Sequence, residues 1–238
     1  MTVASCGEED EVKPDTELGT DGNAGENQES SEETDNGETD LENPDGGVVV
    51  DLGLPSGTLW ADRNIGADSP EDYGYYFAWG ETKQKDTYSW DNYKWCDGSY
   101  VTQIKYCTDS YYGTIDDRIT LEPEDDAATA NWGGGWCMPS EAQLQELCEE
   151  CTWTWTTQNG VKGYKVTGTN GNSIFLPAAG SRVGDYRAYA GSNGCYWSRS
   201  LIEISPCIAW YLVFDKNYYY LGDFSHRYYA FPVRAVVR

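Results

Sequence analysis

The chain has 238 residues, of which 40 are acidic and 16 are basic, and its formal net charge is −24. This acidic balance argues against nucleic acid as a partner, because the protein would repel a phosphate backbone. The sequence contains no run of about 18 consecutive apolar residues, so it predicts no transmembrane helix. The length allows one large domain or two small ones.

The negative charge is concentrated in residues 1–47, which hold 16 acidic residues and a single basic residue, Lys13. This segment has no aromatic residue, whereas the 10 Trp, 19 Tyr and 5 Phe all lie beyond it. Such a composition cannot bury enough apolar surface to offset the chain entropy lost on folding. We therefore expect residues 1–47 to form a disordered acidic tether and residues 48–238 to form one domain.

The tetrapeptide Val3-Ala4-Ser5-Cys6 resembles the lipobox of bacterial lipoproteins, although a chance match is the alternative interpretation. The acidic run that follows Cys6 resembles the surface-export signal of Bacteroidetes lipoproteins. Only five residues precede Cys6, too few for a signal peptide, so we expect a truncated chain or a mis-assigned start codon. The resemblance implies lipidation at Cys6 and a lipid-anchored, surface-exposed position on the outer membrane.

The start of the domain predicts two short strands, one within Val48–Leu52 and one after a turn at Pro55-Ser56-Gly57. Residues 84–120 are polar and aromatic with weak periodicity, so we expect long loops there. Long loops in a compact domain are more often functional than idle.

Three consecutive glycines, Gly133–Gly135, lie between two tryptophans in the stretch NWGGGWCMPSEAQLQEL. A phosphate-binding loop of the Walker type needs Lys and Ser or Thr after its last glycine, and Trp136 and Cys137 stand there instead. We therefore interpret the glycines as a corner of the chain that leads into a helix. Ser140 and Gln143 form a capping box, which marks the start of that helix. The predicted buried face of the helix consists of Leu144, Leu147, Cys148 and Cys151.

A β-hairpin is predicted in TWTWTTQNGVKGYKVTG, where Trp153 and Trp155 alternate with threonines around the turn signal Asn159-Gly160. Asn170-Gly171 marks a second turn. In the later strand IAWYLVFD, Tyr211 alternates with Trp210, and we expect it to face away from the core. Mostly short antiparallel strands, one or two short helices and long loops indicate an α+β domain.

Five separated segments resemble, in order, the Fibrobacter succinogenes major paralogous domain, a family common in secreted Bacteroidetes proteins. They are VDLGLPSGTLWADRNIGADSPEDYGYYFAWGET, LEPEDDAATANWGGGWCMPSEAQLQEL, NGNSIFLPAAGSR, GCYWSRS and FPVRAVV. The chain departs from the family pattern at Cys137, where the family usually has Arg, and at Arg199, where it has Ser. The resemblance implies a C-type-lectin-like fold over residues 48–238, with Val48–Leu52 paired to Val233–Val237, and it implies no catalysis.

Calcium-dependent lectins carry Glu-Pro-Asn or Gln-Pro-Asp in a loop and Trp-Asn-Asp on a strand. This chain has Glu122-Pro123-Glu124 and no Trp-Asn-Asp, so we expect no sugar site of that type. Carboxylates in the same region can in principle hold a hard cation, but we interpret them as a solvated acidic loop and predict no metal. They are Asp116, Asp117, Glu122, Glu124, Asp125 and Asp126.

The single histidine, His226, has no nucleophile or carboxylate partner that the sequence reveals, and we predict no cofactor and no enzymatic activity. If Cys6 is lipidated, seven cysteines remain, and export favours disulfides, with Cys96–Cys107 and Cys195–Cys207 as plausible pairs. Cys148-x-x-Cys151 resembles a redox pair or half a zinc site, but no second motif completes it, so we favour a helix-core role.

The last third of the domain mixes Tyr with Asn, Ser, Asp, Gly and Arg, a composition typical of adaptable binding surfaces. Tyrosine rings also stack on sugars, and in lectin-like folds this region forms the ligand face. Some of these tyrosines can instead belong to the core. In the run Tyr218–Tyr220 we predict that Tyr219 is exposed and that Tyr218 and Tyr220 are not. The predicted ligand-binding residues are Tyr186, Tyr189, Asn193, Tyr211, Asn217, Tyr219, Asp223, His226, Arg227 and Tyr229.

These features predict a monomeric, lipid-anchored binding module at the cell surface that recognises a glycan or protein ligand. The main alternative is a structural or assembly subunit of a surface complex or fimbria. A receptor diversified by a retroelement and a secreted enzyme are further alternatives.

Overall fold

The computed structural model describes residues 47–237, apart from the side chains of Asp223 and Phe224. These residues form mostly antiparallel β-sheets with two short α-helices. The predicted tether lies outside the described residues except for Gly47, and so does Cys6. No helix in the described part is long and apolar enough to cross a membrane.

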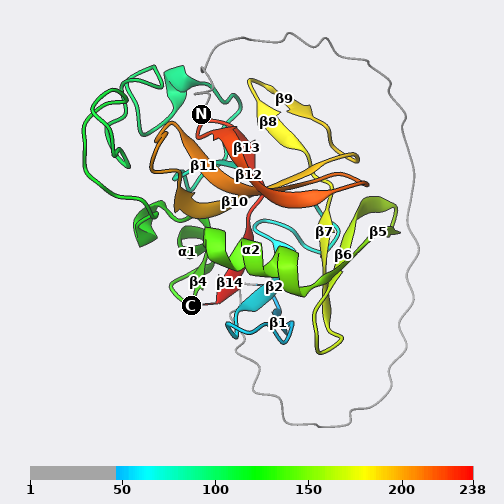
Figure 1. Cartoon of the computed structure of the whole chain (residues 1–238). Helices are drawn as coiled ribbons and strands as arrows, with labels where there is room; N and C mark the ends of the chain where they lie inside the picture. Colours follow the sequence, from blue (N-terminus) through cyan, green and yellow to red (C-terminus); the bar gives the residue numbers. More distant parts are fainter. Residues whose placement is uncertain (1–46, 238) are drawn as a thin grey trace. The chain divides into compact units, whose positions relative to one another are not determined.

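One four-stranded sheet joins the beginning and the end of the described chain (Figure 1). Its order is β1 (Val49–Asp51), β2 (Leu59–Asn64), β14 (Arg234–Val237) and β4 (Trp136–Cys137). The predicted pairing of the first strand with the last is therefore wrong, because β2 lies between them and pairs with both. The turn that ends at Gly57, whose amide donates to the Leu54 carbonyl, returns the chain at once and places β2 beside β1.

A second sheet contains the predicted hairpin. It consists of β5 (Thr152–Gln158), β6 (Val161–Thr167) and β7 (Ser173–Pro177). Asn159 and Gly160 have φ angles of 46° and 85°, as a two-residue turn between twisted strands requires. Trp153 and Trp155 point towards the buried side, whereas Thr152 and Thr154 are exposed. The hairpin and its turn are thus confirmed.

Two further sheets carry most of the last third of the chain. One contains β10 (Gly194–Leu201), β11 (Ile208–Phe214) and β12 (Tyr219–His226) in that order. The other has the order β3 (Phe77–Ala78), β13 (Ala230–Phe231), β8 (Ser181–Val183) and β9 (Tyr186–Ala188). In both sheets all strand pairs among the described residues are antiparallel.

The two α-helices are α1 (Ala127–Trp132) and α2 (Glu141–Glu150), and two short 3-10 turns cover Trp90–Asn92 and Pro123–Asp125. Helix α2 begins as predicted, since Ser140 accepts from the Gln143 amide and the Gln143 side chain accepts from the Ser140 amide. Helix α1 was not predicted. The three glycines do form a corner, but it joins α1 to β4 rather than leading straight into α2.

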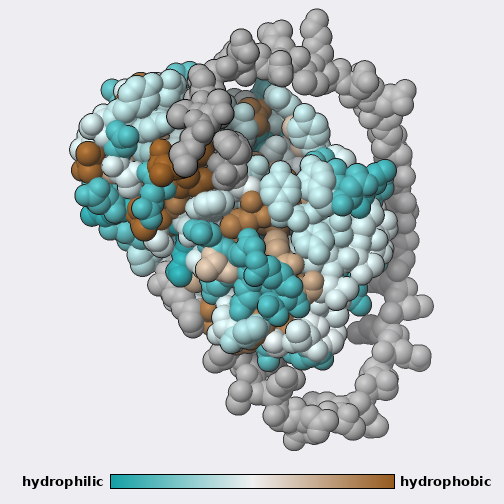
Figure 2. All heavy atoms as spheres, in the orientation of Figure 1, coloured by the Kyte–Doolittle hydropathy of each residue, from teal (hydrophilic) through white to brown (hydrophobic). Residues whose placement is uncertain are grey.

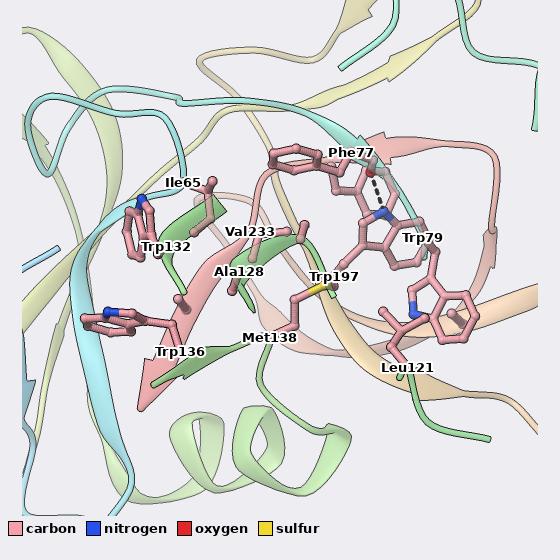
Figure 3. Packing of buried hydrophobic residues seen from close by; sticks show 14 of the residues in the cluster. Ile65, Phe77, Trp79, Leu121, Ala128, Trp132, Trp136, Met138, Trp197 and Val233 are labelled. Carbon is pink, nitrogen blue, oxygen red and sulfur yellow. Dashed lines mark hydrogen bonds between the residues drawn. The ribbon is translucent and has the colours of Figure 1, made fainter. Parts of the chain in front are cut away.

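The largest core cluster lies between the terminal sheet, α1 and the strands of the last third. Figure 3 shows Trp132 and Trp136 edge to face, with ring centroids 5.3 Å apart and Ile65 next to Trp132. On the other side of this cluster, the indole nitrogen of Trp197 donates to the Phe77 carbonyl at 3.0 Å (Figure 3). Burial of such large aromatic side chains supplies much of the driving force for folding.

Arg234 ties the terminal sheet to the hairpin sheet, although it is almost fully buried. Its guanidinium donates to the Asn64 side chain and to the carbonyls of Ala61, Asp62 and Phe175, at 2.9 to 3.2 Å. Burial lowers its pKa to about 10. These four acceptors compensate for the water that the charge has lost.

Candidate functional site

The β8–β9 hairpin and the β11–β12 hairpin meet through a continuous set of backbone contacts. The Asn193 amide donates to the Tyr189 carbonyl at 3.0 Å, and the Asn193 carbonyl accepts from Gly180 at 2.7 Å. The next residue, Gly194, pairs with Phe214, which pairs in turn with Tyr219. Figure 1 accordingly shows the tip of the β11–β12 hairpin close to the end of β9.

Side chains from the two sheets pack against each other where these hairpins meet. Phe231 of β13 stacks on Trp197 at 4.2 Å between ring centroids and lies 5.2 Å from Tyr211. Strand alternation places Val183 and Tyr186 on the same face as Phe231. In the other sheet, Tyr220 is on the same face as Tyr211. The two sheets therefore share a core at Phe231, Trp197 and Tyr211. On the same faces they carry the tyrosines Tyr186 and Tyr220.

Four tyrosines on the two hairpins, which we call the tyrosine rim, are exposed. Tyr186 and Tyr189 are 49% and 65% exposed, and Tyr218 and Tyr220 are 42% and 51% exposed. The rings of Tyr218 and Tyr220 lie 5.5 Å apart. Partial burial, the Asp215 carboxylate and the neighbouring Tyr220 all raise the pKa of Tyr218, so its phenol stays protonated and can donate a hydrogen bond.

Four of the sequence-predicted residues lie at or beside the tyrosine rim. Tyr186 and Tyr189 belong to it, and Asn217 is exposed in the turn that precedes Tyr218. Asn193 is half-buried, and its side-chain oxygen accepts from the Ser192 hydroxyl at 2.9 Å. The structure therefore brings these four residues into one region, as a binding face requires.

Tyr211 and Tyr219 do not present exposed rings, so the predicted orientation of both is wrong. Tyr211 packs against Trp197 and Phe231, because β11 is buried on both faces and its alternation does not separate core from solvent. Tyr219 stacks on Trp153 at 4.4 Å. The alternation within the Tyr218–Tyr220 run is as predicted, but the exposed members are Tyr218 and Tyr220.

Arg227 is fully buried and cannot contact a ligand from outside. Its guanidinium donates to the Tyr93 hydroxyl and to the carbonyls of Lys105, Tyr106 and Pro206. It also lies 4.9 Å from the centroid of the Trp79 ring. The predicted ligand residue is thus an internal clamp that holds the loops between β3 and α1.

His226 and Tyr229 lie in an aromatic cluster at the end of β12 opposite to the rim. The His226 ring is 5.6 Å from that of Trp90 and 5.8 Å from those of Tyr228 and Tyr229. Its Nδ1 is buried without a hydrogen-bond partner, and burial lowers the pKa of the imidazole. The side chain of Asp223, another predicted ligand residue, is outside the described part of the structure.

The six carboxylates of the predicted acidic loop serve different purposes, and several are internal. Asp126 is buried and caps α1, accepting from the amides of Ala128, Thr129 and Met138. Asp125 accepts from Lys94, Lys105 and the Tyr106 hydroxyl. These donors outweigh burial and hold the pKa of Asp125 below its ordinary value.

The remaining members of that loop also have protein partners or are exposed. Asp116 accepts from three backbone amides and from the Arg118 side chain, and Glu122 lies within 4.0 Å of Lys105 and Arg118. Glu124 is largely exposed, and Asp117 is exposed too. The interpretation as a purely solvated loop is therefore wrong for Asp125 and Asp126. No metal-binding group of three or more ligands occurs in the described residues.

The seven described cysteines are free thiols, and neither predicted disulfide forms among them. Cys151 is buried and Cys148 is half-buried against the same core cluster as Leu144 and Leu147, which confirms the helix-core interpretation. Burial raises the pKa of Cys148 and that of Cys195 to about 12, so both thiols stay protonated. Protonated thiols are poor nucleophiles.

A shallow pocket of about 230 Å³ lies elsewhere, between the loop after β2 and the β5–β7 sheet. Its polar lining includes Asp62, Gln158 and Lys165, and its apolar lining includes Ile174 and Phe175. None of the sequence-predicted binding residues lines it.

The rim residues that sequence reasoning missed are Tyr218 and Tyr220. They are exposed because the ring between them, that of Tyr219, packs against Trp153. Trp153 lies 66 positions away in the chain, so the local sequence does not reveal this contact. No family model, curated protein or solved structure matches this chain.

Proposed function

We propose that this protein is a binding module of C-type-lectin-like architecture, related to the Fibrobacter succinogenes major paralogous domain, which recognises a glycan or protein ligand. The observation that carries the proposal is the tyrosine rim, four exposed tyrosines on two hairpins whose chains approach each other at Asn193 and Gly194. Exposed tyrosines supply large contact areas and hydrogen bonds at low entropic cost, which is typical of recognition surfaces.

The backbone of Tyr189 supports this proposal independently. Its φ angle is 59°, a left-handed conformation that is unfavourable for a bulky side chain. The hydrogen bonds that the Tyr189 carbonyl accepts from Ser192 and Asn193 hold it there. Strained positions of this kind cluster at functional sites.

The ionisable groups of the domain favour binding over catalysis. Asp125 and Asp126 are committed to internal donors, and the Cys148 and Cys195 thiols are kept protonated by burial. His226 contacts aromatic rings rather than a carboxylate or a nucleophile. A nucleophile is activated by a base within hydrogen-bond reach, by a lowered pKa or by a metal ion.

We further propose that the protein is lipidated at Cys6 and lies on the outer surface of the outer membrane. The support is the lipobox-like Val3-Ala4-Ser5-Cys6 and the acidic run after it. Replacing Cys6 with Ala in the native precursor should release the protein from membranes. Continued membrane association of that variant would contradict the anchor.

The binding proposal is tested by screening the full chain against an array of glycans and surface proteins. A triple variant Tyr186→Ala, Tyr218→Ala and Tyr220→Ala should lose binding, since truncating one central aromatic contact costs about 2 kcal/mol. Tyr111→Ala is the matched control, because Tyr111 is 64% exposed and lies in the loop region outside the rim. Full-strength binding by the triple variant would place the ligand elsewhere.

A structural or assembly role is the second candidate, and a separate surface favours it. Ile104, Ile115, Ile119 and Ile204 are 40% to 89% exposed. Contacts of Thr108 with Glu203 and of Ile119 with Leu201 bring their segments together. Figure 2 shows hydrophobic surface over these loops at the left of the view.

Exposed apolar patches of this kind often mark protein interfaces. Sedimentation of the wild type and of Ile204→Asp should separate the two candidates. Self-association that Ile204→Asp abolishes would favour an assembly subunit, whereas a monomer in both cases leaves the binding module as the better proposal.

A further inference from the structure

Two arginines on the β8–β9 hairpin face each other without a carboxylate between them. Arg182 and Arg187 are direct cross-strand partners, so their side chains project from the same face of the hairpin. Like charges in directly opposite positions destabilise a strand pair. A pairing of this kind therefore needs a compensating anion or a functional reason.

Their surroundings in the described structure supply only neutral partners. The Arg182 guanidinium donates to the Asp86 carbonyl at 3.2 Å and lies 5.5 Å from the centroid of the Tyr88 ring. The Arg187 guanidinium lies 5.1 Å from the centroid of the Tyr73 ring. No carboxylate of the described residues lies within 4.0 Å of either arginine, whereas Lys85, Lys105 and Arg118 all have such partners.

The Tyr88 ring next to Arg182 is held rigidly. Tyr88 is fully buried, its hydroxyl donates to the Tyr76 carbonyl at 2.7 Å, and its backbone pairs with Gly184 in the turn of the hairpin. The Tyr76 hydroxyl donates to the Ala179 carbonyl at 2.6 Å. A guanidinium carries five N–H donors, so Arg182, which donates to the Asp86 carbonyl, and Arg187, which is hydrogen-bonded to Tyr76, both keep donors for a carboxylate.

The position of the pair on the sheet indicates the shape of the ligand. Strand β9 is the edge of its sheet, and Arg187 is exposed on one face while its neighbour Tyr186 is exposed on the other. Only an extended ligand that wraps around the β9 edge would contact both the arginine pair on one face and Tyr186 of the tyrosine rim on the other. Tyrosine rings offer stacking surfaces to sugar rings, and an acidic sugar supplies the carboxylate at the same time.

We propose that Arg182 and Arg187 form a carboxylate-binding site, and that its ligand is a polysaccharide containing uronic acid. The two guanidinium groups give this part of the surface a local positive charge, although the net charge of the whole chain is negative. Arg187 contacts the carboxylate directly, while Tyr73 and Tyr88 act as positioning residues for the two guanidinium groups. This inference rests on the proposed binding function and specifies the class of ligand.

The test is calorimetric titration of the full chain with polygalacturonate, fully methyl-esterified polygalacturonate and poly-glutamate. We expect binding to polygalacturonate only, since esterification removes the charge and poly-glutamate lacks sugar rings. The double variant Arg182→Gln and Arg187→Gln should bind at least tenfold more weakly. Arg187→Lys should lie between this variant and the wild type, because lysine keeps the charge but loses the bidentate fork.

Lys162→Gln is the matched control, since Lys162 is an exposed cation on β6, in another sheet. This variant should bind polygalacturonate with the affinity of the wild type. Melting curves of each variant show whether it is folded. Failure of the wild type to bind polygalacturonate, or full binding by a folded double variant, would overturn the proposal. Equal binding of poly-glutamate would overturn the polysaccharide assignment and point to an acidic peptide. If another ligand depends on Tyr186 and Tyr220 but not on the arginines, the binding function stands and this inference fails.

Discussion

The indole ring of Trp153 lies flat against the phenol ring of Tyr219, with centroids 4.4 Å apart and an interplanar angle of 9°. This contact joins the β5–β6 hairpin to the edge strand β12, two elements of different sheets. It also explains why Tyr219 is unavailable to a ligand while Tyr218 and Tyr220 are exposed.

Tyr219→Ala should therefore reduce stability rather than affinity. We expect the free energy of unfolding to fall by roughly 2 kcal/mol, because a large, partly buried ring leaves a cavity beside Trp153. Urea denaturation measures this change. Tyr220→Ala is the control and should change stability by less than about 0.5 kcal/mol, since its ring is exposed. A larger loss for Tyr220→Ala would contradict the assignment of the two rings.

Arg227→Met should destabilise the domain by roughly 3 kcal/mol or more, because three buried acceptors and one partly buried acceptor would lose their donor. These acceptors are the Tyr93 hydroxyl and the carbonyls of Lys105, Tyr106 and Pro206. Amide hydrogen exchange in residues 93–107 should accelerate. Arg187→Met, on an exposed arginine, should leave that exchange unchanged. Equal protection in both variants would show that Arg227 is not the clamp of these loops.

Loss of the α1 cap should reduce the free energy of unfolding more than loss of the α2 cap. Asp126→Ala removes the cap of α1 and the acceptor for the buried Met138 amide, so we expect a loss of roughly 3 kcal/mol. Ser140→Ala removes only the α2 capping box and should cost about 1 kcal/mol. Thermal unfolding of the two variants compares them directly, and a reversed order would contradict the role given to Asp126.

Acidification should weaken the fold in two separate pH windows. Burial lowers the pKa of His226 below its ordinary 6.5, so the unfolded chain binds this proton more readily. The stability that neutral His226 contributes is present above pH 6.5 and is lost as the pH falls from 6.5 to the lower folded value. Asp125, whose pKa is held below 3.8, loses its contribution only below that pH. Denaturation of His226→Phe between pH 7 and 5 should lack the first loss. An unchanged slope would show that another group titrates there.

The cysteines provide a further measurement. Alkylation of the unfolded chain without a reductant should label all seven of the described cysteines, because each is a free thiol. In the folded protein, Cys195 should react very slowly, since burial keeps it protonated. Peptide mass mapping reads out both states. An unlabelled Cys96 and Cys107 in the unfolded chain would instead support the disulfide that the sequence suggested.

Local signals explain which elements were predictable. Asn159-Gly160 defines the β5–β6 turn, and Ser140 with Gln143 defines the start of α2, because each signal acts within a few residues. Helix α1 was missed although Asp126 caps it, since a six-residue helix has almost no periodicity. Tyr211 was misplaced because alternation assumes one buried face, and β11 is packed between two core clusters. Some of the predicted binding residues are exposed and others are packed inside for the same reason: contacts distant in the chain determine which tyrosines remain exposed.

Strand β14 occupies an inner position between β2 and β4, although its residues are the last of the sheet to be synthesised. On a ribosome, β1 and β2 emerge early but have to wait until residues 234–237 are available before the sheet can close. The Arg234 guanidinium, which links β2 and β7, also arrives only at that moment. Such long-range closure slows folding. A nascent chain of this kind stays open until residues 234–237 have emerged, and a chain that ends before Arg234 would lack an interior strand rather than an edge.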